Sequence, residues 1–137
     1  LVGSEMCIRD STYTYSDLDL DFTKHAVSKD VGKRYDEEAI KRSVKNLVYT
    51  MHYERPFHPE IGCMVHSLLF ENATPMTAVA VKRTIEDTLN NLEPRIRLLD
   101  VIVVPRNDEN AYEITVVFNI VTQNAPVELT LMLKEVR

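Results

Sequence analysis

The chain has 137 residues, which is the length of one domain and too short for two ordinary domains. Hydrophobic residues make up 45% of the chain and charged residues 27%, a globular balance that excludes a wholly disordered chain. Neither nucleic acid nor a membrane is an expected partner, because the net charge is −5 and no apolar run approaches the roughly 20 residues of a membrane span.

The beginning of the chain differs from the rest. Residues 1–11 show no helical or strand periodicity and lack the apolar stretch of a secretory signal. They resemble a translated sequencing-adaptor remnant joined to an open reading frame, and we expect a disordered, non-native leader. Residues 12–35 alternate acidic with apolar side chains in part, which indicates an extended N-terminal arm or a short strand. Residues 36–137 are expected to form a single α+β domain.

Two segments carry the helical period. Residues 36–51 place their apolar side chains on one stripe, and Asp36 is positioned to cap this helix. Residues 74–92 do the same, and Thr74 followed by Pro75 matches the cap and first position of a helix. The apolar stripes comprise Ile40, Val44, Leu47, Val48 and Met51 in the first helix, and Ala78, Val81, Ile85, Leu89 and Leu92 in the second.

A loop over residues 52–62 separates the first helix from a short helical turn over residues 63–70. Pro56 and Pro59 fix two φ angles of this loop, and Gly62 permits a positive φ at its end. A loop this stiff has little conformational entropy to lose on binding, which suits a surface presented to a partner.

After the second helix the hydrophobic period changes from 3.6 to 2. Strands are predicted over residues 96–104, 112–120 and 127–136, with turns over 105–110 and 122–126. Three successive strands joined by short turns indicate an antiparallel meander. With two main helices packed on one face of this small sheet, the predicted fold class is α+β.

Carboxylates near unusual local sequence raise the question of glycoside hydrolysis, which needs two carboxyl groups on facing walls. The candidates are Glu60, Glu71 and Glu93, but their spacing alone does not make a catalytic pair. We therefore predict no catalytic residue.

Four possible metal donors lie within a short stretch that includes the loop. They are His52, His58, Cys63 and His66, and their spacing matches no ordinary zinc pattern. We therefore predict no metal site and no cofactor.

The sequence Glu93-Pro94-Arg95 stands where the second helix must end and a strand begins. Pro94 makes a rigid corner, so its two charged neighbours project in fixed directions. Arg95 offers a planar fork that suits a carboxylate or a carbonyl. Two interpretations stay open: an internal clamp, in which Arg95 pairs with Glu71 or Glu93, and a docking surface for a partner.

Three ordered motifs resemble a known family. They are RPFHPEIGC at 55–63, LFENATP at 69–75 and EPRI at 93–96. Together they resemble the baseplate wedge subunit of contractile-tailed bacteriophages, a family often labelled lysozyme-like that includes a baseplate component of the type VI secretion machine. The resemblance runs from about residue 15 to residue 137.

The resemblance implies a structural protein of the inner baseplate that starts polymerisation of the tail sheath, with an α+β fold similar to the inner domain of the sheath subunit. It implies that Glu93, Pro94 and Arg95 dock onto the helical core bundle of the other wedge proteins. The implied partners are those wedge proteins and sheath subunits in a hetero-oligomeric assembly, located in the virion tail baseplate and assembled in the bacterial cytoplasm. The family label leaves a peptidoglycan-degrading glycoside hydrolase as the alternative to this non-enzymatic role.

The last predicted strand leaves an edge with unpaired backbone groups, which proteins normally cover or blunt. A strand from a partner is a natural cover, and the resemblance implies that sheath subunits supply extended arms of this kind. The predicted partner-binding residues are therefore Glu93, Pro94, Arg95, Arg55, Phe57, Val127, Leu129 and Leu131.

Overall fold

The computed structural model describes residues 14–134 except 20, 23, 25, 28 and 73, so the predicted leader lies outside the described residues. The chain divides into two compact units, Leu1–Ile40 and Lys41–Arg137, which are described separately. Helix α2, Asp36–Tyr49, contributes residues to both units.

The first unit contains a two-stranded sheet. Strand β1, Ser16–Leu18, pairs antiparallel with β2, Lys33–Tyr35. The guanidinium of Arg34 contacts the buried carboxylate of Asp19 at 3.2 Å and that of Glu38 at 3.0 Å. These bonds connect the end of β1, strand β2 and the first turn of α2.

Asp36 plays a different part from the predicted helix cap. It is the first residue of α2, with a φ of +45°, and its Oδ1 accepts hydrogen bonds from the backbone amides of Thr14 at 2.9 Å and Tyr15 at 3.0 Å. The carboxylate therefore holds the segment that leads into β1 instead of satisfying amides of its own helix.

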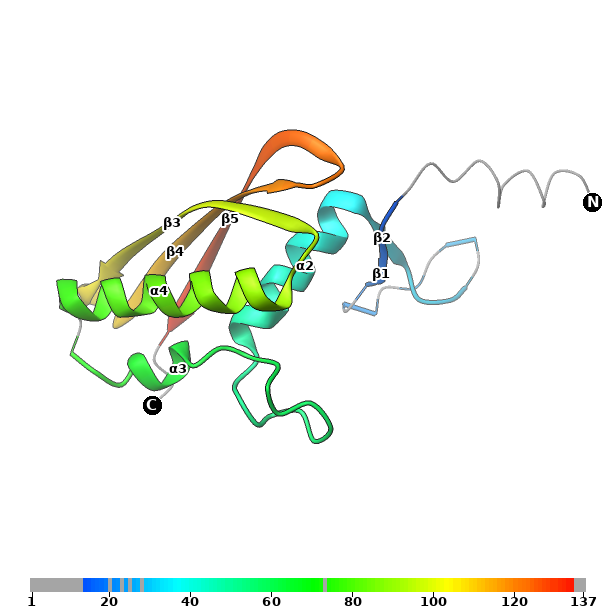
Figure 1. Cartoon of the computed structure of the whole chain (residues 1–137). Coiled ribbons are helices and arrows are strands. Elements are labelled where there is room, and N and C mark those ends of the chain that lie inside the picture. Colours follow the sequence, from blue (N-terminus) through cyan, green and yellow to red (C-terminus); the bar gives the residue numbers. More distant parts are fainter. Residues whose placement is uncertain are drawn as a thin grey trace, which may run out of the picture. The chain divides into compact units, whose positions relative to one another are not determined.

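The second unit is a sheet with helices (Figure 1). Its sheet has the order β3-β4-β5 with antiparallel neighbours, so the predicted meander is confirmed. Its elements after α2 are α3 (Val65–Leu68), α4 (Pro75–Leu92), β3 (Ile96–Arg106), the 3-10 turn η1 (Asn107–Glu109), β4 (Ala111–Ile120) and β5 (Gln123–Lys134).

Some element boundaries differ from the prediction. Strand β3 continues through Pro105 to Arg106, and β5 begins at Gln123 and includes Pro126. Both prolines lie on the outer strands of the sheet, where a missing backbone N–H costs no ladder hydrogen bond if it faces outward. The predicted turns were therefore too long, because proline was interpreted as the end of a strand. Helix α2 ends at Tyr49, two residues before the predicted end.

The core lies between the sheet and α4, which runs along one face of the sheet in Figure 1. The inward side chains of the central strand β4 alternate along it, and Ile114, Val116 and Phe118 are completely buried. Opposite them, Val81, Ile85 and Leu89 of α4 are also completely buried, as the helical period predicted. The α+β class is confirmed.

Helix α4 begins as the sequence predicted, and a substitution of Thr74 tests whether its side chain stabilises the start of the helix. The Thr74 hydroxyl accepts from the Thr77 amide at 3.2 Å, and Pro75 is the first helical residue. Replacing Thr74 with alanine should lower the free energy of unfolding by about 1 kcal/mol, measured by urea denaturation at pH 7. Thr74→Ser is the control and should unfold like the wild type; equal losses in both variants would contradict the capping role.

Candidate partner-binding site

The corner between α4 and β3 is built as its sequence predicts. Glu93 caps the C-terminus of α4, and its amide donates to the Leu89 carbonyl at 3.0 Å. Pro94 follows and is exposed. The Ile96 amide, where the strand begins, donates a hydrogen bond to the Glu93 carbonyl at 3.4 Å. The chain therefore reverses direction at Pro94 over a fixed backbone.

A buried carboxylate holds this corner from within. The Glu93 side chain is 3% exposed, and its Oε1 accepts from Arg95 Nε at 2.5 Å while its Oε2 accepts from Arg95 Nη2 at 2.7 Å. The Ser43 hydroxyl on α2 donates to the same Oε2 at 2.5 Å. Burial alone would raise the pKa of Glu93, but the hydrogen bonds from Arg95 and Ser43 and the charge of Arg95 outweigh it, so the pKa is lowered from the usual value of a glutamate.

The corner is also tied to the turn between β4 and β5, because the Val121 amide donates to the Arg95 carbonyl at 3.0 Å. The internal clamp between Arg95 and Glu93 is thus present, whereas Glu71 lies elsewhere, in a hollow that Thr74 also lines. The clamp does not bury the corner completely: Pro94 is exposed and the Arg95 side chain is 31% exposed. Both interpretations of Arg95 are compatible with this arrangement.

Ser43 is the site residue that the sequence analysis missed. It lies on α2, 50 residues before Glu93, and nothing in the local pattern of a solvated helix face connects the two. A signal is visible only afterwards, because Ser43 lies three residues after Ile40 and four before Leu47, at the margin of the apolar stripe.

The proline loop presents the predicted residues Arg55 and Phe57 to solvent. Both are exposed, Phe57 to 91%. The loop leaves α2 and returns to it, because the Cys63 amide donates to the Thr50 carbonyl at 2.8 Å. Gly62, at a φ of +150°, passes so close to this point that a Cβ there would lie 2.7 Å from the carbonyl carbon and oxygen of Met51.

The predicted contact residues of the last strand point inward. Val127 is 6% and Leu131 is 3% exposed, and Leu129 is half-buried, so these side chains belong to the core. What β5 offers to a partner is its backbone, because it is an outer strand of the sheet. One of its carbonyls, that of Met132, accepts a hydrogen bond from the Tyr49 hydroxyl at 2.9 Å.

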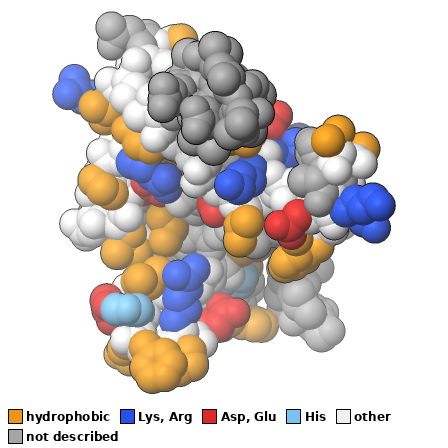
Figure 2. All heavy atoms as spheres, turned by 90° about the vertical axis from the view of Figure 1, so that its right-hand side faces the viewer, with side chains coloured by type: hydrophobic (Ala, Val, Ile, Leu, Met, Phe, Trp, Pro, Cys, Tyr) orange, Lys and Arg blue, Asp and Glu red, His pale blue; other side chains and the backbone are white. Residues whose placement is uncertain are grey.

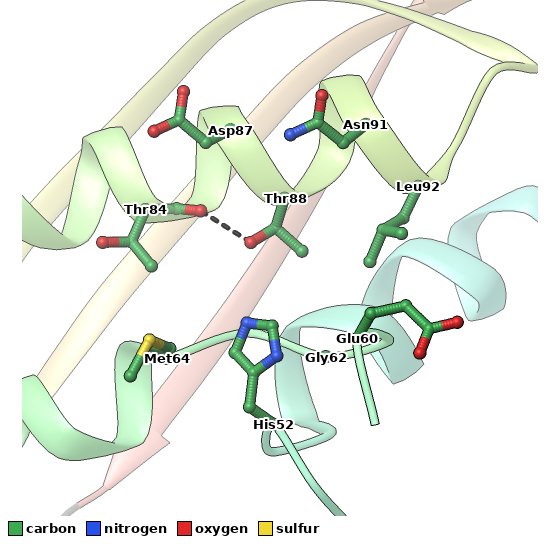
Figure 3. A pocket seen from close by; sticks show the side chains of 9 residues that line it. All are labelled: His52, Glu60, Gly62, Met64, Thr84, Asp87, Thr88, Asn91 and Leu92. Atoms are coloured by element: carbon green, nitrogen blue, oxygen red, sulfur yellow. Dashed lines mark hydrogen bonds between the residues drawn. The ribbon is translucent and has the colours of Figure 1, made fainter. Parts of the chain in front are cut away.

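The three candidate carboxylates are not brought together. Glu60 lines a hollow of about 300 Å³ between the loop and α4, which Figure 3 shows, whereas Glu71 lines a different hollow beside Thr74 and Glu93 is bound to Arg95. A backbone hydrogen bond and a hydrogen bond from His58 lower the pKa of Glu60, the opposite of what a general acid needs.

The possible metal donors each have another neighbour, and His52 Nδ1 lies 3.4 Å from the Pro59 carbonyl oxygen. The Thr88 hydroxyl donates to the buried sulfur of Cys63, His66 Nε2 lies 3.1 Å from the Tyr49 carbonyl, and His58 pairs with Glu60. Burial raises the pKa of the Cys63 thiol. Within the described part of the chain, no three His, Cys, Asp or Glu side chains gather in a way that could hold a metal ion. The helices described there are also too short or too polar to cross a membrane.

The chain is an α+β domain with a rigid, partly exposed corner, and comparison with known proteins identifies its family. Residues 34–125 match the family model described as baseplate wedge protein gp25, and the chain belongs to this family. It is 38% identical over 114 residues to baseplate wedge protein gp25 of Enterobacteria phage T4, which covers 83% of this chain and 86% of that protein. The family resemblance inferred from the three motifs is confirmed.

Solved structures share the fold. A putative tail lysozyme from Geobacter sulfurreducens is 26% identical with a TM-score of 0.69, over 74% of this chain and 92% of that chain. A chain of the anti-feeding prophage baseplate is 20% identical with a TM-score of 0.63, over 90% and 87%. A chain of the type VI secretion system baseplate complex is 14% identical with a TM-score of 0.57, over 71% and 93%. At these last two identities the likeness concerns the fold alone.

Proposed function

We propose that this chain is a structural subunit of a contractile-tail baseplate wedge, that it docks onto the other wedge proteins through the corner of Glu93, Pro94 and Arg95, and that it starts assembly of the tail sheath. Membership of the gp25 family supports the place in a baseplate. The observation that carries the docking surface is the clamped corner, which is rigid, charged and still partly exposed.

Rigidity is what makes the corner suitable for docking. The Glu93 carboxylate fixes the Arg95 guanidinium before any partner arrives, so little side-chain entropy remains to be lost on binding. Glu93 and Ser43 thus act as positioning residues, and Arg95 and Pro94 form the surface that a partner touches.

The outer edge of β5 supports a second contact, with sheath subunits. An outer strand presents backbone groups that pair readily with an added strand. The side chains of Glu128 and Thr130, which alternate with the inward side chains of β5, are exposed. We place this assembly in the virion tail baseplate, put together in the host cytoplasm.

We also propose that the chain is not an enzyme. The separate positions of Glu60, Glu71 and Glu93 and the lowered pKa of Glu60 support this. Likeness to a putative tail lysozyme is the observation in favour of wall degradation. A turbidity assay on purified cell walls decides between the two roles: clearance by the wild type that is lost in Glu60→Gln or Glu71→Gln would contradict our proposal.

The docking proposal is tested with two substitutions of Arg95. Lysine retains the charge beside Glu93 but not the planar fork, so Arg95→Lys should stay folded and bind the purified wedge proteins of the same genome at least about tenfold more weakly. Arg95→Ala should lose the complex altogether in a pull-down. Arg106→Ala removes an exposed arginine of β3 that pairs with Glu113, and it should bind like the wild type.

Circular dichroism melts separate the two interpretations of the corner. Arg95→Lys with a wild-type melting temperature and weakened binding supports docking. If Arg95→Lys binds as well as the wild type while Arg95→Ala unfolds, the corner is a clamp only and the docking proposal is wrong.

A further inference from the structure

The loop between α2 and α3 is a preformed structure with its own closing bonds. The Tyr53 amide donates across the loop to the Pro59 carbonyl at 3.1 Å, and the Ile61 amide donates to the His58 carbonyl at 3.1 Å. Met51 and Glu54 bond reciprocally, since the Met51 amide donates to Glu54 Oε2 at 2.9 Å and the Glu54 amide to the Met51 carbonyl at 3.2 Å. Residues 53–59 therefore form a closed tip on a bonded base.

Local backbone geometry reinforces this closure. Tyr53 has a φ of +67°, a left-handed conformation that a bulky residue adopts only when its surroundings impose it. Pro56 and Pro59 fix two further φ angles, and the close approach of Gly62 to Met51 leaves no room for a Cβ. The tip is thus held in one shape without help from a partner.

This rigid tip carries apolar side chains that the second unit leaves uncovered. Phe57 is 91% exposed and Tyr53 is 82% exposed, and Met51 at the base is half exposed. Figure 2 shows hydrophobic side chains gathered at the bottom of the view, beside histidine and charged side chains. An exposed aromatic side chain on a fixed backbone has few torsion angles left to order when a partner buries it, which is typical of an interface anchor.

The charged side chains in and next to the tip differ in whether they are paired within the chain. The two carboxylates are used internally, because Glu54 accepts from Met51 and Glu60 pairs with His58 at 3.1 Å. Arg55 makes no ion pair with any residue that the structure describes. In a chain with a net charge of −5, the tip therefore offers a positive charge two residues before its most exposed aromatic ring.

We propose that residues 53–59 form a plug, in which Phe57 enters an apolar socket on another baseplate protein and Arg55 pairs with carboxylates at the rim of that socket. The inference rests on the proposed baseplate function and names the chemistry of one partner surface. The plug is separate from the clamped corner: in Figure 1 the loop projects below α2 and α4, whereas the corner lies at the right-hand end of α4, where β3 begins.

The test measures binding of the full chain to the purified wedge proteins of the same genome by calorimetry. Phe57→Ala should weaken binding about thirtyfold and Phe57→Leu less, because leucine retains part of the apolar contact. Arg55→Glu should weaken binding at low salt, and the loss should shrink as added salt screens the rim. Met76→Ala is the matched control, since Met76 is 80% exposed on α4, and it should bind like the wild type.

Gly62→Ala tests whether the preformed shape matters. A Cβ at this position would meet the Met51 carbonyl, so the base of the loop must open although Phe57 is still present. Binding should weaken while the thermal melt still shows a folded protein. Wild-type affinity in Gly62→Ala would overturn the claim of a preformed plug.

Failure of the plug and failure of the baseplate function are distinguishable. If the wild type binds no wedge protein, the proposed function fails. If the wild type binds and Arg95→Lys weakens binding but Phe57→Ala does not, the plug alone is wrong. Self-association of the wild type that Phe57→Ala abolishes in sedimentation, or Phe57-dependent co-sedimentation with phosphatidylglycerol vesicles, would also overturn the assignment to a baseplate partner.

Discussion

Replacing Glu93 with glutamine is expected to lower the free energy of unfolding by about 2 kcal/mol at pH 7. The buried carboxylate accepts two hydrogen bonds from Arg95 and one from Ser43, and glutamine presents an NH₂ group where one of those donors points. Loss of a fully buried pair would cost more, but the Arg95 side chain is 31% exposed and water can partly replace its lost partner.

Urea denaturation provides the measurement, and a second charged pair provides the control. Arg106 also donates from Nε and Nη2 to a carboxylate, that of Glu113, but these side chains are 55% and 29% exposed. Glu113→Gln should change the free energy of unfolding by no more than about 0.5 kcal/mol. Similar losses at the two sites would show that the corner has no special structural role.

The effect of Glu93→Gln should also depend on pH. The pKa of Glu93 is lowered in the folded protein, so its stabilising contribution is fully present above about pH 4.5 and is lost as the pH falls through the lower, folded value. Glutamine does not titrate, and the difference between wild type and variant should therefore shrink on acidification. A difference that stays constant from pH 7 down to pH 3 would indicate that folding does not lower the pKa of Glu93.

Replacing Phe118 with alanine should have the largest effect on stability, about 4 kcal/mol. Phe118 is completely buried on the central strand β4, opposite Leu98 of β3 and Val127 of β5, so truncation leaves a cavity in contact with both neighbouring strands. Ile102→Ala on the other face of β3 is the control; Ile102 is 48% exposed, and its truncation should cost under about 1 kcal/mol. Equal costs would mean that the core does not lie on the helix side.

The helices and the order of the strands follow from short-range signals. The helical period alone was enough to predict the buried stripe of Val81, Ile85 and Leu89. Thr74 followed by Pro75 indicated where α4 begins. The ends of strands were harder to predict, because the outcome at Pro105 and Pro126 depends on whether a strand is an outer or a central one. That property belongs to the sheet as a whole and not to the local sequence.

The candidate site was predictable to the extent that it is local. Pro94 alone indicated a rigid corner. The sequence left two possible partners for Arg95, and the structure shows that Glu93 is the one it pairs with. Ser43 could not be found, because its contact with Glu93 exists only once α2 and α4 have packed. Val127 and Leu131 were predicted as contact residues because their strand forms an edge of the sheet. That edge presents backbone groups, whereas these two side chains lie on the buried face.

The hydrogen bond from Tyr49 to the Met132 carbonyl bears on the length of β5 that a neighbour's strand could pair with. At one end Pro126 has no N–H to donate, and at the other the Met132 carbonyl is already engaged. If a neighbour's strand pairs with β5, it would lack a donor at Pro126 and would share the Met132 carbonyl with Tyr49, so pairing would be strongest between these two positions. The structure of β5 and its contact with Tyr49 would thus limit the length of the strand that can pair with this edge.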